Sequence, residues 1–231
     1  MINIIKDLSD GKVVSYSVIP ITANSGLVEI VSNCTTLTRI YRNGTVRKYL
    51  ESHLPKGLEL ADHIQRDEIL KAVLRKYKYS LAYYTIITYI FGVGDRHFDN
   101  IMLCESGDLF HVDYGFILGS DPKIFHPKVR LNTYMLEGID DNEFKELCFE
   151  IFNDLRGKVG QIYTLMLCLP DVNKDLIKEH LRKVFFLGEV NVKGKLEFMI
   201  DNSRDSVSGG FNDYAHTLSK KTSGMMSYFY G

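Results

Sequence analysis

The residues best suited to chemistry lie in one stretch, Gly92–Gly119, with the sequence GVGDRHFDNIMLCESGDLFHVDYGFILG. Asn100 and Asp113 carry oxygen atoms of the kind that bind Mg²⁺. Asp95 and His97 lie five and three residues before Asn100 and can exchange a proton with a hydroxyl group. Because phosphoryl transfer from ATP needs a divalent metal, a proton acceptor and positive charge, this stretch predicts a phosphotransferase.

A β-hairpin is expected to position the two metal ligands. The apolar runs Ile101–Leu103 and Leu109–Val112 are joined by the turn Glu-Ser-Gly-Asp. Asn100 precedes this hairpin and Asp113 follows it, so its twist can bring both side chains to one ion.

A long helix is predicted immediately before the catalytic stretch, from Glu68 to Phe91. Its apolar residues recur at spacings of three and four, namely Ile69, Val73, Tyr77, Leu81, Tyr84 and Ile87. Gly92 and Gly94 are expected to end this helix.

The chain beyond Leu131 is also predicted to be helical. Asp140 and Glu143 form a candidate capping box. One apolar helix face follows, made of Phe144, Leu147, Cys148, Ile151, Phe152 and Leu155. Further helices are expected at residues 158–168, 173–186 and 193–219.

Near the N-terminus, Val14–Ile19 and Leu27–Val31 are β-rich runs around the turn Ala-Asn-Ser-Gly, and they predict a hairpin at the edge of a small sheet. The order of elements is therefore two strands, a long helix, a hairpin and then helices. This order suits an α+β fold with a small N-terminal lobe joined to a mainly helical C-terminal lobe.

Composition limits the class of protein. The 231 residues are 45% hydrophobic and 25% charged, which is typical of a soluble globular protein. The net charge of −1 gives no reason to expect nucleic acid as a partner. The four cysteines form no CxxC pair, which favours a reducing, cytoplasmic location over a zinc site or disulfide framework. No signal peptide or membrane-spanning run is evident, so contact with a membrane is expected to be peripheral.

The catalytic stretch resembles the DRHxxN catalytic loop and the Asp-Phe-Gly metal motif of phosphatidylinositol 3- and 4-kinases. The matching residues are Asp95, Arg96, His97, Asn100 and Asp113-Tyr114-Gly115. Tyr114 is a mild departure, because Tyr and Phe can both fill an apolar slot. Asp-Arg-His reverses the His-Arg-Asp order of protein kinases. The segment LGSDPKIFHPKVRLNTYMLEG looks most like the class III, phosphatidylinositol-specific enzymes.

The resemblance implies a protein-kinase-like two-lobed fold, with an N-lobe reduced to its hinge strands and a mainly helical C-lobe. It also implies an ATP site and a Mg²⁺ (or Mn²⁺) site. Tyr16 would line the adenine pocket, Glu29 to Val31 would form the hinge, and backbone groups of Val31 would contact adenine. Met102 and Val112 would form the apolar floor. Without the motif, these apolar residues would be ordinary core residues.

The same resemblance assigns the catalytic roles. Asn100 and Asp113 would hold the metal. His97 would accept the inositol hydroxyl proton or stabilise the γ-phosphate, with Asp95 as the alternative base, and the sequence does not separate these roles. Arg96 is expected to order the loop. Taken singly, such residues are more often structural than catalytic, but their joint occurrence in this order favours catalysis.

The segment from Phe116 to Leu131 corresponds to the activation loop. Its cations include Lys123, Lys128 and Arg130. This sparse positive charge suits plain phosphatidylinositol on endomembranes, with the 3-position favoured, although the same residues could be solvated loop charges.

The family's phosphate-covering loop and ATP-binding lysine would precede the strands seen here, and Lys12 is not assigned that role. We therefore expect residues 1–34 to be a remnant of the N-lobe and hinge, 35–221 the C-lobe, and 222–231 a tail. A regulatory protein or a separately encoded N-lobe is a candidate partner. The alternatives are a phosphatidylinositol 4-kinase and a pseudokinase or scaffold. A related protein kinase is disfavoured because the chain has no Trp.

Overall fold

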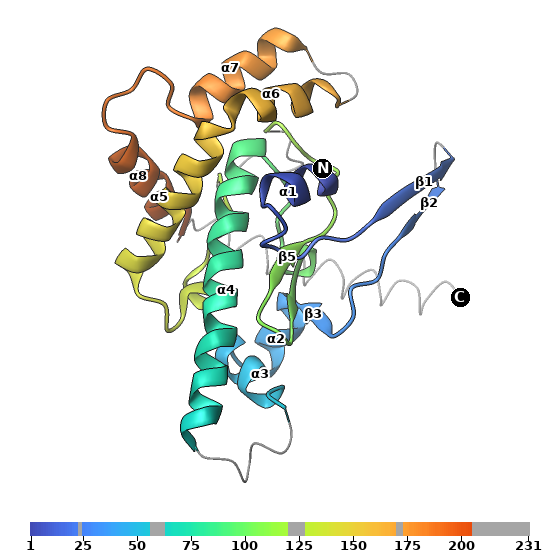
Figure 1. Ribbon diagram of the computed structural model, residues 1–231, viewed down its shortest axis with the longest axis vertical. Helices are drawn as coiled ribbons and strands as arrows, with labels where there is room; N and C mark the ends of the chain where they lie inside the picture. The colour runs from blue at the N-terminus through green and yellow to red at the C-terminus, as the bar shows by residue number, and fades with distance from the viewer. Residues whose placement is uncertain (23–24, 56–62, 120–127, 170–172, 205–231) are drawn as a thin grey trace, which may run out of the picture.

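The computed structural model describes residues 1–22, 25–55, 63–119, 128–169 and 173–204, which form an α+β arrangement as expected (Figure 1). The first part contains α1 Ile2–Leu8, β1 Val18–Thr22, β2 Ser25–Val28, β3 Cys34–Thr36, α2 Leu37–Asn43 and α3 Val46–Ser52. The middle part contains α4 His63–Phe91, the 3₁₀ turn η1 Phe98–Asn100, β4 Ile101–Cys104, β5 Leu109–His111 and the 3₁₀ turn η2 Thr133–Leu136. The last part contains α5 Asp141–Gly157, α6 Val159–Leu167, α7 Lys174–Val184 and α8 Val192–Arg204.

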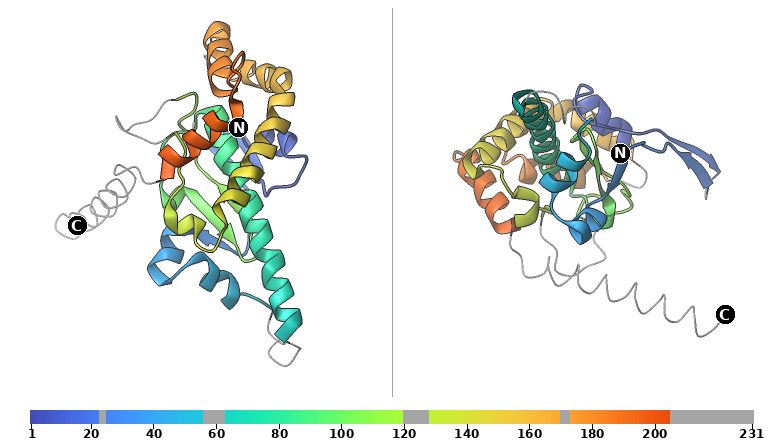
Figure 2. Two further views of the ribbon diagram at one scale, coloured as in Figure 1. Left: turned by 90° about the vertical axis from the view of Figure 1, so that its left-hand side faces the viewer. Right: turned by 90° about the horizontal axis from the view of Figure 1, so that it is seen from below.

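Helix α4 is the centre of the molecule. Its residues 81–91 are buried on every side, as expected of a helix that is apolar all round. Helices α6 and α7 lie near its C-terminal end, whereas α2 and α3 lie toward its N-terminal half (Figures 1 and 2). Among the described helices, none is both long enough and apolar enough to cross a bilayer.

The predicted catalytic hairpin is confirmed as β4 and β5, and β3 pairs with β4 on its other side. The face that carries Ile101, Leu103 and Leu109 is completely buried against α4. The Leu109 amide donates a hydrogen bond to the Ser80 hydroxyl of α4 at 2.9 Å. The end of α4 and the hairpin therefore form one packed unit, and both lead into the catalytic stretch.

Tyrosine hydroxyls of α4 connect it to distant segments. Tyr77 donates to the Met135 carbonyl at 2.9 Å, and Tyr84 donates to the Val14 carbonyl at 3.1 Å. Both rings are buried, so these hydrogen bonds satisfy polar groups that water cannot reach. The N-terminal segment is thereby held on the core beside α4.

The N-terminal hairpin exists but differs in position and surroundings. Its strands are shifted to β1 and β2, and among the described residues they pair only with each other rather than joining a larger sheet. Every residue of both strands is exposed, and the hairpin extends away from the core (Figure 1). The first strand begins late because the Val14 carbonyl is bonded to Tyr84 and Tyr16 is buried.

The predicted C-terminal helices are confirmed as α5, α6, α7 and the first part of α8, and residues 205–219 lie outside the described residues. One half of the capping box is present, because the Asp140 carboxylate accepts from the Glu143 amide at 2.9 Å. The other half is replaced: Glu143 accepts a hydrogen bond from Lys78 at 2.7 Å. Helices α1, α2 and α3 were not predicted, since seven residues are too few for a clear periodicity.

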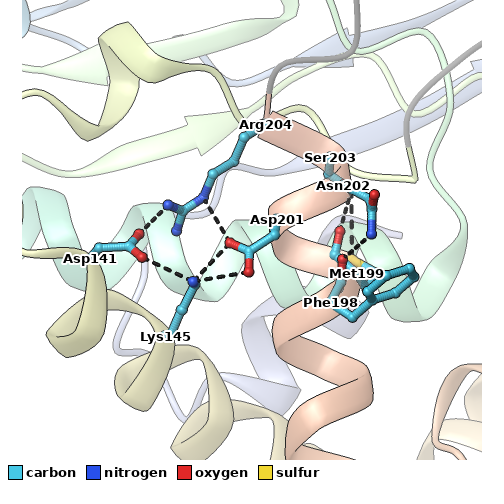
Figure 3. A network of polar contacts seen from close by, with 8 residues as sticks. All are labelled: Asp141, Lys145, Phe198, Met199, Asp201, Asn202, Ser203 and Arg204. Atoms are coloured by element: carbon cyan, nitrogen blue, oxygen red, sulfur yellow. Dashed lines mark hydrogen bonds and ion pairs between the residues drawn. The ribbon is translucent and has the colours of Figure 1, made fainter.

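Charged residues join α8 to α5 (Figure 3). The Lys145 ammonium lies 2.9 Å from Asp141 and 2.8 Å from Asp201. Arg204, at the end of α8, also pairs with Asp141. Partial burial acts to raise the pKa of Asp141, but hydrogen bonds from Lys145 and Arg204 hold that pKa below its ordinary value.

We expect Asp141→Asn to destabilise the protein by about 0.5–1 kcal/mol at neutral pH, because the network is partly exposed. A lowered folded-state pKa contributes stability above the unfolded pKa and loses it as pH falls through the folded value. The destabilisation should therefore shrink at acid pH and at high salt. Urea unfolding at several pH values measures it, with Glu150→Gln on the exposed face of α5 as control. An effect independent of pH would contradict this view.

Candidate active site

The catalytic stretch leaves α4 through an unusual backbone conformation. Asp95 and Asp113 both have left-handed φ angles, +51° and +58°. Such angles cost a non-glycine residue on the order of 1 kcal/mol or more and persist only where neighbouring groups hold them. Both residues are also candidate functional residues by their type and spacing in the sequence.

Arg96 holds the two parts of the site together. Its side chain is buried and donates to the Gly94 carbonyl at 2.9 Å and to the Val112 carbonyl at 2.7 Å. It also donates to the backbone carbonyl of Asp113. The guanidinium carbon lies 5.5 Å from the centre of the Tyr114 ring, within the range of a cation–π contact. Arg96 thus ties the Asp-Arg-His loop to the Asp-Tyr-Gly segment.

Backbone hydrogen bonds reinforce the same junction. They run from Gly94 N to Phe116 O at 3.0 Å, from Leu118 N to Phe91 O at 2.8 Å and from Gly119 N to Gly92 O at 2.9 Å. On α7, His180 Nε2 lies 2.7 Å from the Ile90 carbonyl oxygen. The end of α4 is therefore bonded both to the segment that follows the metal motif and to α7.

Gly92 is required by this close approach. Its φ is +54°, and a Cβ atom there would lie 2.6 Å from the Gly119 amide nitrogen. We expect Gly92→Ala to destabilise the protein by about 2–4 kcal/mol, since it combines a strained φ with a backbone clash.

Gly160→Ala in α6 is the matched control, because its Cβ would meet open space. It should instead be neutral or stabilise by up to about 1 kcal/mol. Urea unfolding compares the two variants. Equal stabilities would contradict the packing described at Gly92.

The two expected metal ligands lie at the open end of the β4–β5 hairpin. The Asn100 side-chain nitrogen donates to the Asp95 carbonyl at 3.1 Å, which leaves the amide oxygen as the atom able to bind a cation. The Val112 amide donates to the Asn100 carbonyl at 3.0 Å, and Asp113 comes next in the chain. The Asp113 residue is exposed, and its carboxylate accepts from the Gly115 amide at 3.3 Å.

This donor set fits a hard cation. It offers one anionic and one neutral oxygen, as Mg²⁺ sites that also use phosphate oxygens do. No cluster of three or more His, Cys, Asp or Glu side chains able to hold a metal occurs in the described part of the chain. An ion at this site would therefore need further ligands from a bound nucleotide or water.

The candidate bases lie beside each other. His97 Nε2 is 3.9 Å from the Asp95 carboxylate, and both side chains are partly buried. The His97 carbonyl accepts from the Asn100 amide at 2.9 Å. Since both groups are close to the metal ligands, the geometry leaves each able to act as the base.

The residues expected around adenine lie on the sheet face away from α4. Met102 pairs with Phe110 across the hairpin, and Val112 follows two residues later on the same side. The Tyr16 ring lies 6.0 Å from the Phe110 ring in an edge-on arrangement. Burial raises the pKa of Tyr16 to about 12.

The residues expected to form the hinge are held by local contacts. The Glu29 amide donates to the Ser17 carbonyl at 2.9 Å, and the Glu29 carboxylate accepts from the Ser17 amide at 2.8 Å. The Val31 carbonyl accepts a hydrogen bond from the Cys34 thiol at 3.0 Å. The structure thus places Glu29 beside β1, and Val31 next to the start of β3.

The expected head-group cations differ in their surroundings. Lys123 lies outside the described residues. Lys128 is exposed. Arg130 is buried, and its guanidinium carbon lies 4.7 Å from the centre of the Phe98 ring. Arg130 is thus well placed to position the loop that contains Phe98.

Sequence reasoning missed several positioning groups, namely His180, Phe98 and the carbonyls that Arg96 and Gly94 contact. Carbonyl partners have no signature in the sequence. Phe98 could have been singled out as the one apolar residue within the polar run Asp95–Asn100.

Comparison with known proteins gives consistent similarities. A family model described as Phosphatidylinositol 3- and 4-kinase matches residues 4–168. The chain is 34% identical over 179 residues to Phosphatidylinositol 3-kinase pik3 of Schizosaccharomyces pombe, covering 74% of this chain and 22% of that protein. It is 32% identical over 215 residues to the root isoform of phosphatidylinositol 3-kinase from Glycine max, covering 88% and 26%.

A third relative is named as a type 3 enzyme, in keeping with the class III resemblance of the sequence. The Caenorhabditis elegans protein named Phosphatidylinositol 3-kinase catalytic subunit type 3 is 33% identical over 159 residues, which cover 62% of this chain and 18% of that protein. The chain spans about a fifth to a quarter of the length of these curated relatives.

Proposed function

Because the chain belongs to the phosphatidylinositol 3- and 4-kinase family, we propose that it carries the catalytic and metal-binding part of a kinase that phosphorylates phosphatidylinositol, at the 3-position. Residues 1–34 then belong to the N-lobe and hinge, residues 35–221 to the C-lobe, and residues 222–231 to a tail. Relatives named phosphatidylinositol 3-kinase support the choice of the 3-position over the 4-position.

The observation that carries this proposal is the set of hydrogen bonds made by Arg96. They join the loop that bears Asp95 and His97 to the segment that bears Asp113. This junction supports the proposal, because transfer of a phosphoryl group requires a proton acceptor and a bound cation close together.

Each residue then has a role. The Asp113 carboxylate and the Asn100 amide oxygen hold Mg²⁺ or Mn²⁺. The metal-bound ATP supplies the γ-phosphoryl group. His97 or Asp95 accepts the proton of the inositol hydroxyl, and Met102 and Val112 form the apolar floor under the adenine.

The lipid is expected to approach from an endomembrane surface. The exposed ammonium of Lys128, together with Lys123, attracts the anionic head group. Arg130 contributes to the head-group site mainly through its contact with Phe98. Tyr16, Glu29 and Val31 complete the nucleotide side, and a regulatory protein is the expected protein partner.

The direct test incubates the chain, alone and within its longest natural open reading frame, with labelled ATP, Mg²⁺ and phosphatidylinositol vesicles. Chromatography should show phosphatidylinositol 3-phosphate. Asp95→Asn and His97→Gln should both reduce the amount of this product. The variant that also removes the pH dependence of the rate identifies the base. Product at the 4-position would redirect the assignment. No product from the longest chain would favour a scaffold instead.

A further inference from the structure

Cys34 and Cys104 lie directly opposite each other on β3 and β4. The neighbouring pair, Asn33 and Glu105, is hydrogen-bonded, since the Glu105 amide donates to the Asn33 carbonyl at 2.9 Å. Bonded and non-bonded pairs alternate along an antiparallel ladder, so the cysteines occupy a non-hydrogen-bonded position. Cα atoms at such positions are about 4.5 Å apart, within the range spanned by disulfide bonds.

The two thiols differ in access. Cys104 is buried, whereas Cys34 is half-buried and lines a pocket of about 460 Å³ between β3, α2 and α3. The same pocket is lined by two exposed cations, Arg39 and Lys48, and by one carboxylate, Glu105, which has His53 beside it, so the positive charges outnumber the negative one. Such a pocket attracts a small anionic molecule to the Cys34 sulfur.

Cys34 also contacts the hinge. Its thiol donates to the Val31 carbonyl at 3.0 Å. A disulfide would remove this hydrogen and release that carbonyl from its donor. This single hydrogen bond therefore couples the redox state of the cysteine pair to the hinge residue Val31.

We propose that Cys34 and Cys104 form a reversible disulfide by exchange with an anionic low-molecular-weight disulfide that enters this pocket. The Cys34 thiolate attacks one sulfur of that molecule, forms a mixed disulfide and releases the first small thiolate. Cys104 then attacks the Cys34 sulfur and releases the second. The two protons lost by the protein go to the two small thiolates, and the two electrons reduce the small disulfide.

The order of attack follows from burial. Burial raises the pKa of Cys104 to about 12 and also raises the pKa of Cys34. Only thiolates attack disulfides, so the exchange is slow at neutral pH and accelerates as pH rises. Cys34 reacts first because it is accessible from the pocket, and Cys104 serves as the resolving thiol.

The test uses the Cys168→Ser chain, which lacks the exposed cysteine that could join two molecules. After treatment with oxidised glutathione and quenching with a thiol-alkylating reagent in denaturant, the oxidised chain should carry one alkyl group, on Cys148, and be two hydrogen atoms lighter than that composition requires, whereas the reduced chain should carry three alkyl groups. Digestion without reduction should release one peptide linking Cys34 to Cys104. Adding either Cys34→Ser or Cys104→Ser to this chain should abolish the linked peptide. Cys34→Ser is the milder change because Cys34 is half-buried.

The pocket's part in the reaction is tested by charge. Arg39→Gln with Lys48→Gln should slow oxidation by the anionic glutathione disulfide several-fold and should speed oxidation by the cationic disulfide cystamine, which the two cations repel. A persistent glutathione adduct on Cys34 without the linked peptide, or a bond to Cys148, would overturn the pairing. Equal slowing with both reagents would overturn the entry route.

One consequence rests on the proposed function. If adenine uses the Val31 carbonyl, the oxidised chain should bind Mg²⁺-ATP roughly three- to tenfold more tightly than the reduced chain, as expected for one released acceptor. Calorimetry on both forms measures this, and equal affinities would overturn the link to the hinge. If neither form binds Mg²⁺-ATP while the disulfide forms, the proposed nucleotide site fails and the cysteine pair stands.

Discussion

Replacing Asp113 by Asn is expected to abolish phosphoryl transfer and the Mg²⁺-dependent part of ATP binding while leaving the fold intact. Asp113 is exposed, and its carboxylate accepts a hydrogen bond that an Asn oxygen of similar size can also accept. Arg96 contacts the Asp113 backbone carbonyl, which the substitution does not change. Loss of a negative charge at the metal should lower the rate by a factor of about 10² to 10³ or more.

Thermal melts with and without Mg²⁺-ATP measure both parts of this prediction. The variant should keep the midpoint of the free protein and lose the rise caused by Mg²⁺-ATP. Asp108→Asn is the matched control, because Asp108 lies in the turn of the same hairpin and bonds to Ser106. A variant of Asp113 that melts much earlier yet gains the full rise would show that the carboxylate is structural.

Replacing Arg96 by Ala is expected to be the most destabilising single change in the site, by about 3–5 kcal/mol. The guanidinium is buried, and its removal leaves the carbonyls of Gly94 and Val112 without these donors. The loop that carries Asp95 and His97 would then separate from the metal segment. Activity should fall with stability.

Arg96→Lys separates charge from geometry. A lysine keeps the positive charge but lacks the planar fork that reaches several carbonyls at once, so it should recover only part of the stability. Arg42→Ala on the exposed surface of α2 is the control and should change unfolding by at most about 0.5 kcal/mol. Urea unfolding ranks the variants. An Arg96→Ala protein as stable as the control would refute the structural role of Arg96.

Much of this fold could be predicted because local patterns determine it. The period of α4, the turn between β4 and β5 and the Asp140 cap are all readable within a few residues. The motif from Asp95 to Asp113 could be found for the same reason, since its spacing is contained in one short segment.

Other features depend on distant residues. The start of β1 is displaced because Val14 is bound by Tyr84, and the second half of the capping box is lost because Lys78 attracts Glu143. No pattern within either segment indicates these partners, because they come from another part of the chain.

The sequence alone therefore determined the family-like catalytic motif, the order of elements and the residue types available for metal and proton chemistry. Only the tertiary structure decided that Arg96 binds carbonyls on both sides of the site, that Arg130 lies buried against Phe98, and that Cys34 faces Cys104. The physical reason is that residue type and spacing act locally, whereas burial, strand pairing and carbonyl partners are set by which segments pack together.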